Sequence, residues 1–277
     1  MTAANNNTYE QVYYVNDDDG VMSRVAHVIC VLTRRSLMVA GFNATRELLT
    51  MHYTGYSTNK PVWELDFFEH LFGNEPLLAA KEKVKGVFIC SDKYLIVPED
   101  LYDETEAKKW LSNIHFVETK DVVEAYPLLD DKAIYLLAAP VHITELIKIN
   151  FKKAVALPLP VYHFTNAVAQ SLYLQCCITG EQVCATLHNY SQLLWHRVFD
   201  YTCAEDIAYE IRLLCKENNI SPDKVNMSCN TISAAEYNVV NGLSQYFPTI
   251  KAGNGISIGS QWDTAICLSQ QLFACVL

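Results

Sequence analysis

The stretches Val31–Ala40 (VLTRRSLMVA) and Leu187–His196 (LHNYSQLLWH) follow one plan, and this plan decides the fold. Each reads as an apolar strand, a polar turn with a serine (at the sixth position in the first stretch and the fifth in the second), and a second apolar strand, which is the pattern of a β-hairpin. The two stretches lie in opposite halves of the 277-residue chain, and each is followed by a further helix and strand. The repeated order predicts two related α/β lobes, each a mixed β-sheet flanked by helices.

The first lobe is predicted to begin with a three-stranded meander. Alternating apolar and polar residues predict its strands at His27–Leu32, Leu37–Phe42 and Glu47–Tyr56. The elements expected next are a helix opened by Pro61 and strands from Val87 and Tyr94. They are followed by a helix capped by Asp103, with Glu106 three residues on, and by a buried strand at Ala133–Pro140. The buried stripe of that helix is expected to consist of Ala107, Trp110, Leu111 and Ile114. We place the lobe boundary near Pro140, with a flexible N-terminal segment at 1–24, a first lobe at 25–140 and a second lobe at 141–277.

The second lobe is predicted to alternate helices and strands around the second hairpin. The expected elements are a helix at Ile143–Asn150, a strand at AVALPLP, a helix at Phe164–Cys177, the hairpin Gln182–Tyr201, a strand at KVNMSC, a helix at Ala234–Phe247, a short strand at Thr249 and a last helix from Trp262. Behind the hairpin, Thr202 and Glu205 form the pattern of a capping box. The residues that follow place apolar side chains on one face, so the clearest helix of the sequence is expected there.

Charge narrows the classes of partner. The net charge of −10 disfavours electrostatic binding of nucleic acid or of an anionic membrane over a broad surface, because both require clustered lysine and arginine. Residues 1–140 hold 13 basic and 21 acidic side chains, so the acidic excess lies mainly in the first half. A charged partner is therefore expected to be basic and to meet that half.

The ten cysteines fall mostly inside apolar runs, with no Cys-x-x-Cys pair and no histidine-rich spacing. Buried free thiols in a reducing compartment are the better interpretation, and zinc is disfavoured. The start of the chain, MTAANNNTYEQ, lacks the features of a signal peptide. No apolar run approaches the ~20 residues that span a bilayer, so we predict a cytoplasmic protein without membrane insertion.

The doubled plan is similar to the actin-like ATPase (ribonuclease H-like) fold of actin, sugar kinases and the Hsp70 nucleotide-binding domain. More closely, YLIVPEDLYDETEAKKWL (Tyr94–Leu111) and VALPLPVYHFTNAVAQSLYL (Val155–Leu174) resemble an uncharacterised family of Bacteroidetes proteins with a degenerate actin-like fold. The resemblance covers the chain from about residue 25. It implies a fold in which two related lobes clamp ATP, and it implies no assigned activity.

An active member of the fold needs Asp-x-Gly in each phosphate hairpin, the acid to organise hydrated magnesium and the glycine to let turn amides approach the phosphate. The adenosine motif needs a Gly-Gly pair after a strand. The degenerate phosphate-loop positions are Val31, Thr33 and Arg34 in the first hairpin and Leu187, Asn189 and Ser191 in the second, and the degenerate adenosine-loop positions are Ser228, Cys229 and Asn230. These departures predict a pseudo-ATPase with no cofactor and no metal.

Two further features are candidates for ligand binding. Arg34 and Arg35 could hold an anion at the first turn, although a solvated hairpin tip is the favoured interpretation. The segment around Gly253, Gly255 and Gly259 resembles a dinucleotide loop, but its spacing is off by one residue and no acidic residue follows at the required distance. A glycine-rich connector is favoured there.

Two other features are candidates for a catalytic role. Cys176 and Cys177 could be redox-active, but no basic neighbour lowers a thiol pKa in the sequence, so packing at a helix end is favoured. His188 and His196 flank Ser191, which suggests a nucleophile, but the sequence gives no oriented acid for a triad, and Asp200 would need a geometry that the sequence does not define. We therefore predict no catalytic residue.

The preferred hypothesis is a non-catalytic adaptor or scaffold that binds another protein, with the nucleotide motifs lost. It rests on analogy with actin-like adaptors of pilus and secretion machinery. The alternative is a divergent ATP-dependent phosphotransferase or ATPase that uses noncanonical cleft residues with ATP and magnesium. A homodimer with a structural task is a third hypothesis.

Overall fold

The computed structural model describes residues 9–15, 20–57, 59–128, 132–165 and 171–277, and in it the chain divides into two compact units. Unit 1 comprises Met1–Leu159 with Val276–Leu277, and unit 2 comprises Pro160–Cys275. The division falls later than the expected boundary near Pro140, because the strand at Val155–Pro158 pairs with a strand of unit 1.

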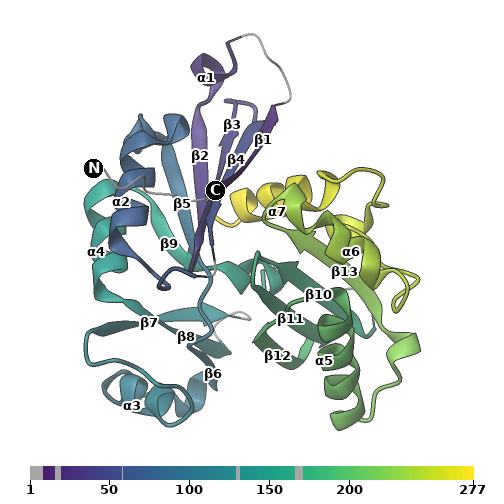
Figure 1. Ribbon diagram of the computed structural model, residues 1–277. Coiled ribbons are helices and arrows are strands. Elements are labelled where there is room, and N and C mark those ends of the chain that lie inside the picture. Colours follow the sequence, from purple (N-terminus) through teal and green to yellow (C-terminus); the bar gives the residue numbers. More distant parts are fainter. Residues whose placement is uncertain (1–8, 16–19, 58, 129–131, 166–170) are drawn as a thin grey trace. The chain divides into compact units, whose positions relative to one another are not determined.

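Unit 1 is built on a six-stranded sheet with the order β1-β4-β3-β2-β5-β9 (Figure 1). Its strands are β1 Tyr9–Val15, β2 His27–Thr33, β3 Ser36–Phe42, β4 Leu48–Tyr56, β5 Val84–Ile89 and β9 Val155–Pro158. The predicted meander is confirmed as β2, β3 and β4, which pair antiparallel. Strands β2 and β3 are buried almost throughout, as expected for central strands covered on both faces.

The N-terminal segment predicted to be flexible contributes an edge strand instead. Tyr9–Val15 pairs antiparallel with β4, and α1 spans Val21–Arg24, so the prediction for residues 1–24 is wrong for these two elements. Residues 1–8 and 16–19 lie outside the described residues. Local sequence patterns did not predict this strand, because its register depends on a partner strand about forty residues further along the chain.

Two helices, α2 (Leu65–Asn74) and α4 (Val141–Asn150), lie side by side in Figure 1. Pro61 precedes α2 by four residues and does not open it, because Trp63 has a positive φ of 57° that interrupts the helix. The buried rings of Phe67, Phe68 and Phe72 face the core, and Phe72 packs on Phe151 just after α4 with ring centroids 4.9 Å apart.

A second sheet of unit 1 has the order β6-β8-β7. Its strands are β6 Tyr94–Pro98, β7 Asp121–Leu128 and β8 Ala133–Pro140, and the connection from β6 to β7 contains η3 Glu99–Leu101, η4 Glu104–Glu106 and α3 Ala107–Ser112. Asp103 caps η4 by accepting a hydrogen bond from the Thr105 amide. Ile114 lies beyond the end of α3 and is exposed, so its place on the buried stripe was wrong.

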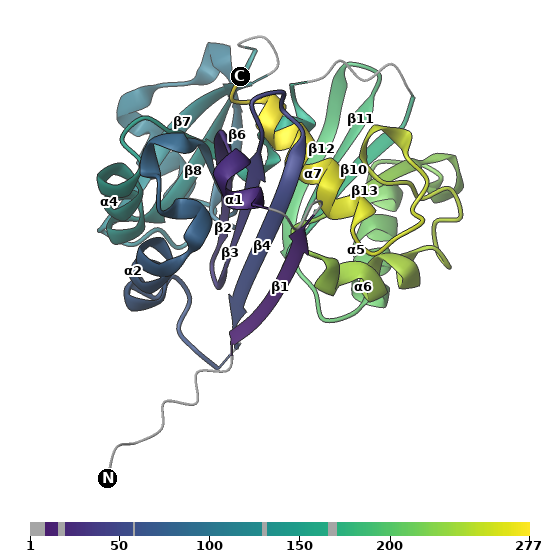
Figure 2. The same cartoon turned by 90° about the horizontal axis from the view of Figure 1, so that it is seen from above.

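Unit 2 holds a four-stranded sheet with the order β12-β11-β10-β13. Its elements are β10 Tyr173–Ile178, β11 Gln182–Asn189, β12 Gln192–Asp200, α5 Ala204–Glu217, β13 Asn226–Thr231, α6 Tyr237–Leu243 and α7 Asp263–Ala274. Besides η3 and η4, the described residues form short 3-10 helices at η1 Pro76–Leu78, η2 Lys81–Lys83, η5 Leu159–His163, η6 Pro222–Lys224, η7 Ala234–Glu236 and η8 Gly253–Gly255. Viewed from above in Figure 2, α5 and α6 lie on one side of β10 and β13, and α7 lies on the other.

The predicted helix at Phe164–Cys177 is wrong over its last residues. Tyr173–Ile178 is a central strand, paired antiparallel with β11 and parallel with β13, while residues 166–170 lie outside the described residues. The apolar string YLQCCI suits either structure by composition, so the two neighbouring strands decide. The short strand expected at Thr249 is reduced to a bridge between Ser228 and Lys251.

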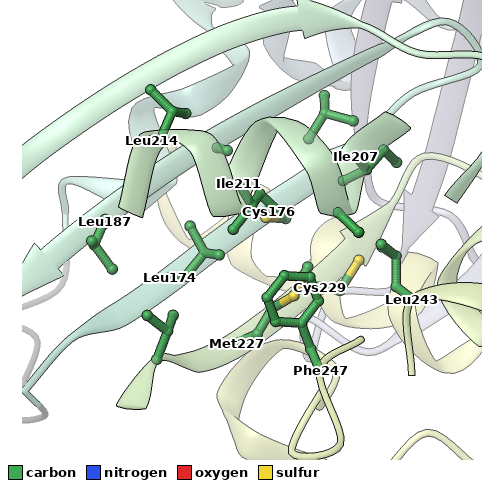
Figure 3. Packing of buried hydrophobic residues seen from close by; sticks show 14 of the residues in the cluster. Leu174, Cys176, Leu187, Ile207, Ile211, Leu214, Met227, Cys229, Leu243 and Phe247 are labelled. Atoms are coloured by element: carbon green, nitrogen blue, oxygen red, sulfur yellow. The ribbon is translucent and has the colours of Figure 1, made fainter. Parts of the chain in front are cut away.

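The helix predicted behind the hairpin is confirmed as α5, but its cap is shifted by one residue. The Asp206 side chain accepts hydrogen bonds from the Thr202 amide at 2.9 Å and the Thr202 hydroxyl at 2.5 Å, whereas Glu205 was the acid expected in this position. Ile207, Ile211 and Leu214 on α5 pack over the sheet (Figure 3). These side chains, with Leu174 and Leu187 from the strands, form the core of unit 2.

Candidate functional site

Strand order identifies which turns of the two units correspond. In each unit three consecutive antiparallel strands are followed by a parallel fourth, as β4-β3-β2-β5 and as β12-β11-β10-β13. The counterpart of the β2–β3 turn, Thr33–Ser36, is therefore the β10–β11 turn, Thr179–Gln182. The sequence comparison had matched the first turn to the β11–β12 turn, which contains Asn189 and Ser191. The mismatch arose because strand neighbours, rather than hairpin composition, establish the equivalence.

The β2–β3 turn is closed by its own hydroxyls. The Thr33 and Ser36 hydroxyls lie 2.7 Å apart in a buried hydrogen bond, and the Arg35 amide donates to Thr33 Oγ1 at 3.3 Å. Val31, at the predicted phosphate-loop position, is buried among the core side chains of β2. An amide that would have to face a phosphate is thus already bonded within the turn.

Arg34 and Arg35 are half-buried against the segment that follows β4, so a solvated hairpin tip does not describe them. The Arg35 guanidinium donates to the Lys60 carbonyl at 3.2 and 3.0 Å. The Arg34 carbonyl accepts hydrogen bonds from the Trp63 amide at 2.8 Å and the Tyr56 hydroxyl at 3.2 Å. The turn is therefore held by hydrogen bonds to the segment that follows β4 as well as by those within the turn.

The β10–β11 turn has the same internal closure. The Thr179 hydroxyl accepts from the Gln182 amide at 3.0 Å, and the Thr179 amide donates to the Gln182 carbonyl at 2.8 Å. The two residues at its tip are Gly180 and Glu181, and Ile178 is fully buried two residues before the glycine. This turn thus keeps a glycine and a carboxylate but has isoleucine where Asp-x-Gly would have its acid.

The predicted adenosine-loop positions lie inside a strand rather than after one. Ser228, Cys229 and Asn230 belong to β13, with Cys229 in the hydrophobic core. Asn230 is a structural link on the opposite face: its amide nitrogen donates to Gln271 Oε1 at 2.7 Å, and its oxygen accepts from the Gly253 amide at 3.0 Å. These bonds tie α7 and the glycine segment to the sheet.

The β11–β12 turn contains the remaining predicted positions. Leu187 is fully buried in the core, Asn189 accepts a hydrogen bond from the Ser171 hydroxyl at 3.0 Å, and Ser191 is exposed. Tyr190 lies between them with a positive φ of 54° and a side chain that is 57% exposed. The three predicted residues therefore have three different environments and form no common site.

A histidine cluster, defined as His163, His188 and His196, lies beside this turn. The Thr186 hydroxyl is 2.7 Å from Nδ1 of His163 and 2.7 Å from Nδ1 of His196. The Phe164 ring packs against His188 and His196, with centroid distances of 6.0 and 5.6 Å. The Nε2 atoms of His163 and His188 are buried without a hydrogen-bond partner.

The environment of the histidine cluster favours neutral rings. Burial, followed by the neighbouring His196 and His188, lowers the pKa of His163 well below its usual value. Burial and His188 lower the pKa of His196 to about 3, and burial lowers the pKa of His188. Sequence reasoning singled out His188 and His196 but missed His163 and Thr186, since only the folding of η5 onto β11 brings them together. At neutral pH the cluster offers no positive charge to a phosphate.

The proposed serine, histidine and aspartate do not assemble. Asp200 accepts from the Gln182 side chain at 3.0 Å, at the end of β11 opposite to His188. Six residues of strand separate Gln182 from His188, or about 20 Å at ~3.3 Å per residue. A nucleophile at Ser191 thus has no carboxylate to orient its histidine.

The glycine segment before α7 is occupied by protein groups. The Gly253 amide is bonded to Asn230, and the Asp263 carboxylate accepts from the amides of Gly259 and Ser260 at 2.7 Å each. A side-chain carboxylate therefore stands at the start of α7, where a dinucleotide loop would place its phosphate. The expectation of a structural connector agrees with this geometry.

All ten cysteines are free, eight of them buried and Cys203 and Cys275 partly exposed. Cys176 and Cys177 lie on β10 instead of at a helix end, and burial raises the pKa of Cys176 well above its usual value. Within the described ranges, no three histidine, cysteine or acidic side chains are grouped to hold a metal ion. The helices of that same part of the chain include none with the length and apolar character needed to cross a bilayer.

The shared hydroxyl of Thr186 supports a prediction. Thr186→Val should lower the free energy of unfolding by about 1–3 kcal/mol, because it leaves the Nδ1 atoms of two histidines without their partner. Urea unfolding followed by circular dichroism measures the change. Thr186→Ser keeps the hydroxyl and removes only the methyl group, so it should retain most of the stability. A Thr186→Val variant as stable as the unaltered chain would contradict the role of the shared hydroxyl.

Two solved structures share this architecture. A Bacteroides thetaiotaomicron protein with an actin-like ATPase fold and unknown function aligns with a TM-score of 0.70 at 13% identity, over 92% of this chain and 99% of that one. A chain of the PilM–PilN type IV pilus biogenesis complex aligns with a TM-score of 0.56 at 11% identity, over 92% and 99%. The protein thus has the actin-like ATPase fold, as its sequence predicted.

The family follows from the sequence itself. Residues 29–250 match DUF3822, a family of proteins of unknown function, and the chain belongs to it. No match to a curated protein is found.

Proposed function

We propose that this protein is a non-catalytic adaptor or scaffold of the actin-like fold that binds another protein. The observation that carries the proposal is the closure of both equivalent turns by a threonine. Thr33 Oγ1 accepts from the Arg35 amide, and Thr179 Oγ1 accepts from the Gln182 amide. A phosphate-binding turn needs such amides unbonded and aimed at the ligand.

The loss of an acid anchor supports the same proposal. In the Asp-x-Gly pattern the carboxylate would stand two residues before the glycine, and in the β10–β11 turn this residue is the buried Ile178. The β2–β3 turn has arginines in place of the glycine. Magnesium prefers carboxylate and phosphate oxygens, so neither turn supplies its usual partner at that position.

A binding role is supported by analogy of fold. The PilM–PilN structure is a complex of pilus biogenesis proteins, and one of its chains has the same fold over nearly the full length. Function does not follow from fold alone, so this likeness supports a class of function and no particular partner. The ten free thiols suit a reducing compartment, and we place the protein in the cytoplasm.

A thermal-shift measurement tests the loss of nucleotide binding. We expect the melting temperature of the full chain to stay the same with millimolar ATP and magnesium, since a ligand that binds the folded state must stabilise it by mass action. At one hundred times its Kd a nucleotide would add about 2.7 kcal/mol, a rise of several degrees. Such a rise, with magnesium alone as the control, would contradict the proposal.

One observation favours a second candidate, a divergent ATP-dependent phosphotransferase or ATPase. The β10–β11 turn keeps Gly180 and, next to it, the partly exposed carboxylate of Glu181. If ATP and magnesium stabilise the protein, Glu181→Gln is the variant that separates the candidates. Loss of the magnesium-dependent part of the shift would establish Glu181 as a noncanonical anchor.

A further inference from the structure

The connection between β6 and β7, residues 99–120, places exposed apolar side chains among carboxylates. Phe116 is 82% exposed, Leu101 is 66% exposed and Ile114 is 61% exposed. Single exposed apolar residues are ordinary, whereas several on one short connection with surrounding charge have the character of an interaction site. We call this connection the acidic–apolar surface.

The acidic–apolar surface rests on a packed and hydrogen-bonded base. The rings of Tyr102 and Trp110 meet edge-on with centroids 6.4 Å apart, and both pack on the core formed by Val97 and Leu136. His115 Nε2 is 2.8 Å from the Tyr94 carbonyl of β6. A preorganised surface loses little conformational entropy when it binds.

The acidic–apolar surface carries a net negative charge. Its acidic residues are Glu99, Asp100, Asp103, Glu104, Glu106 and Glu118, and its basic residues are Lys108, Lys109 and Lys120. Lys109 pairs with Glu106 at 2.6 Å, and Lys108 donates to the carbonyls of Thr119 and Asp121 at 2.9 Å each. Two of the three cations are thus engaged within the surface, and an excess of exposed carboxylates faces outward.

From this arrangement we infer that the acidic–apolar surface docks a basic, apolar-containing segment of a partner protein. Lysine and arginine of the partner would face the carboxylates around Asp100, while its apolar side chains cover Phe116 and Ile114. Charge complementarity selects this occupant, because a second copy of the chain would bring the same negative surface and an anionic membrane would be repelled. The inference rests on the proposed binding function and names the chemistry of the partner.

A synthetic amphipathic peptide of lysine and leucine, about 15 residues long, is the direct probe. We expect fluorescence anisotropy to show binding to the full chain that weakens with salt. Phe116→Ser with Ile114→Ser keeps every charge and should weaken binding about tenfold, the cost of losing an apolar anchor. Glu99→Gln with Asp100→Asn should weaken binding and reduce its salt dependence.

Ile149→Ser is the matched control, because Ile149 is 69% exposed and lies on α4, outside the acidic–apolar surface. It should bind the peptide as the unaltered chain does. Equal affinity of the apolar variant and the unaltered chain, or an equal loss in the control, would overturn the inference. Sedimentation of both proteins completes the test, since a dimer abolished by the apolar variant would identify a second copy as the occupant.

Capture from the native cell separates this inference from the proposed function. We expect the tagged chain and the Ile149→Ser control to retain a partner with a basic segment, and the Phe116→Ser, Ile114→Ser variant to lose it. A partner retained by all three chains would refute the docking surface and leave the adaptor role standing. Stabilisation by ATP with magnesium would instead remove the proposed function itself.

Discussion

Lowering the pH from 7 to 5 should destabilise unit 2 by several kcal/mol, through the histidine cluster. A histidine that titrates near 6.5 in the unfolded chain but stays neutral when folded costs about 2 kcal/mol at pH 5. His163 is fully buried with its pKa well below that value, and His196 has a pKa of about 3. Together they predict a loss of about 4 kcal/mol, to which His188 adds.

The sign follows from proton binding. Below pH 6.5 the unfolded chain binds protons at these rings and the folded chain does not, so protons favour unfolding. The stability is fully present above pH 6.5 and is lost as the pH falls. Hydrogen bonds to neighbouring groups lower the pKa of the Asp206 and Asp263 carboxylates. These two groups therefore change the stability only at lower pH, below about pH 3.8.

Urea unfolding at pH 7, 6 and 5, followed by circular dichroism and by amide exchange of the β11–β12 hairpin, measures this loss. His163→Asn with His196→Asn removes both titrating rings and should flatten the dependence between pH 7 and 5. His70→Asn is the control, because His70 is exposed on α2. If unit 2 is as stable at pH 5 as at pH 7, or if the double variant keeps the full slope, the buried neutral cluster is not the cause.

Replacing Ile211 by alanine should destabilise the protein by about 2–5 kcal/mol. Its side chain is 0% exposed on the inner face of α5, within the core it forms with the strands of unit 2 (Figure 3). Truncation removes buried apolar surface and leaves a cavity that rigid strands on the opposite side cannot fill. The free energy of unfolding from urea titration measures the change.

Tyr209→Ala is the matched control on the same helix. Tyr209 is 65% exposed, so its truncation removes more atoms but little buried surface, and the change should stay within about 0.5 kcal/mol. Alanine is the better helix former at both positions, so helix propensity cannot account for a loss in either variant. Similar losses in the two variants would therefore contradict the role given to the buried face of α5.

Local patterns were enough to predict much of the fold. The alternation in His27–Tyr56 predicts the meander because each of those strands pairs with its neighbour in the chain. The apolar face of α5 was readable for the same reason, since helix periodicity depends on residues three and four apart. The doubled α/β plan and the family likeness also follow from these local elements, and comparison with solved structures confirms the fold.

The candidate site was less readable, because its meaning depends on distant partners. Composition matched the β2–β3 turn to the β11–β12 turn, whereas strand order matches it to Thr179–Gln182. The assignment of β10 as a strand and of β1 as part of the sheet required partners from elsewhere in the chain. Hairpin sequences resemble one another, so only the neighbouring parallel strand distinguishes them.

Residue type and short-range order in the sequence are enough to predict the two-lobed plan, the missing acid before the first turn and the acidic excess of the first half. Strand pairing was needed to show which turns are equivalent, that Thr33 and Thr179 close them, and that His163 and His196 share the Thr186 hydroxyl. Hydrogen bonding and burial act over a few ångströms in space. Residues far apart in the chain meet at that distance only after the strands have paired.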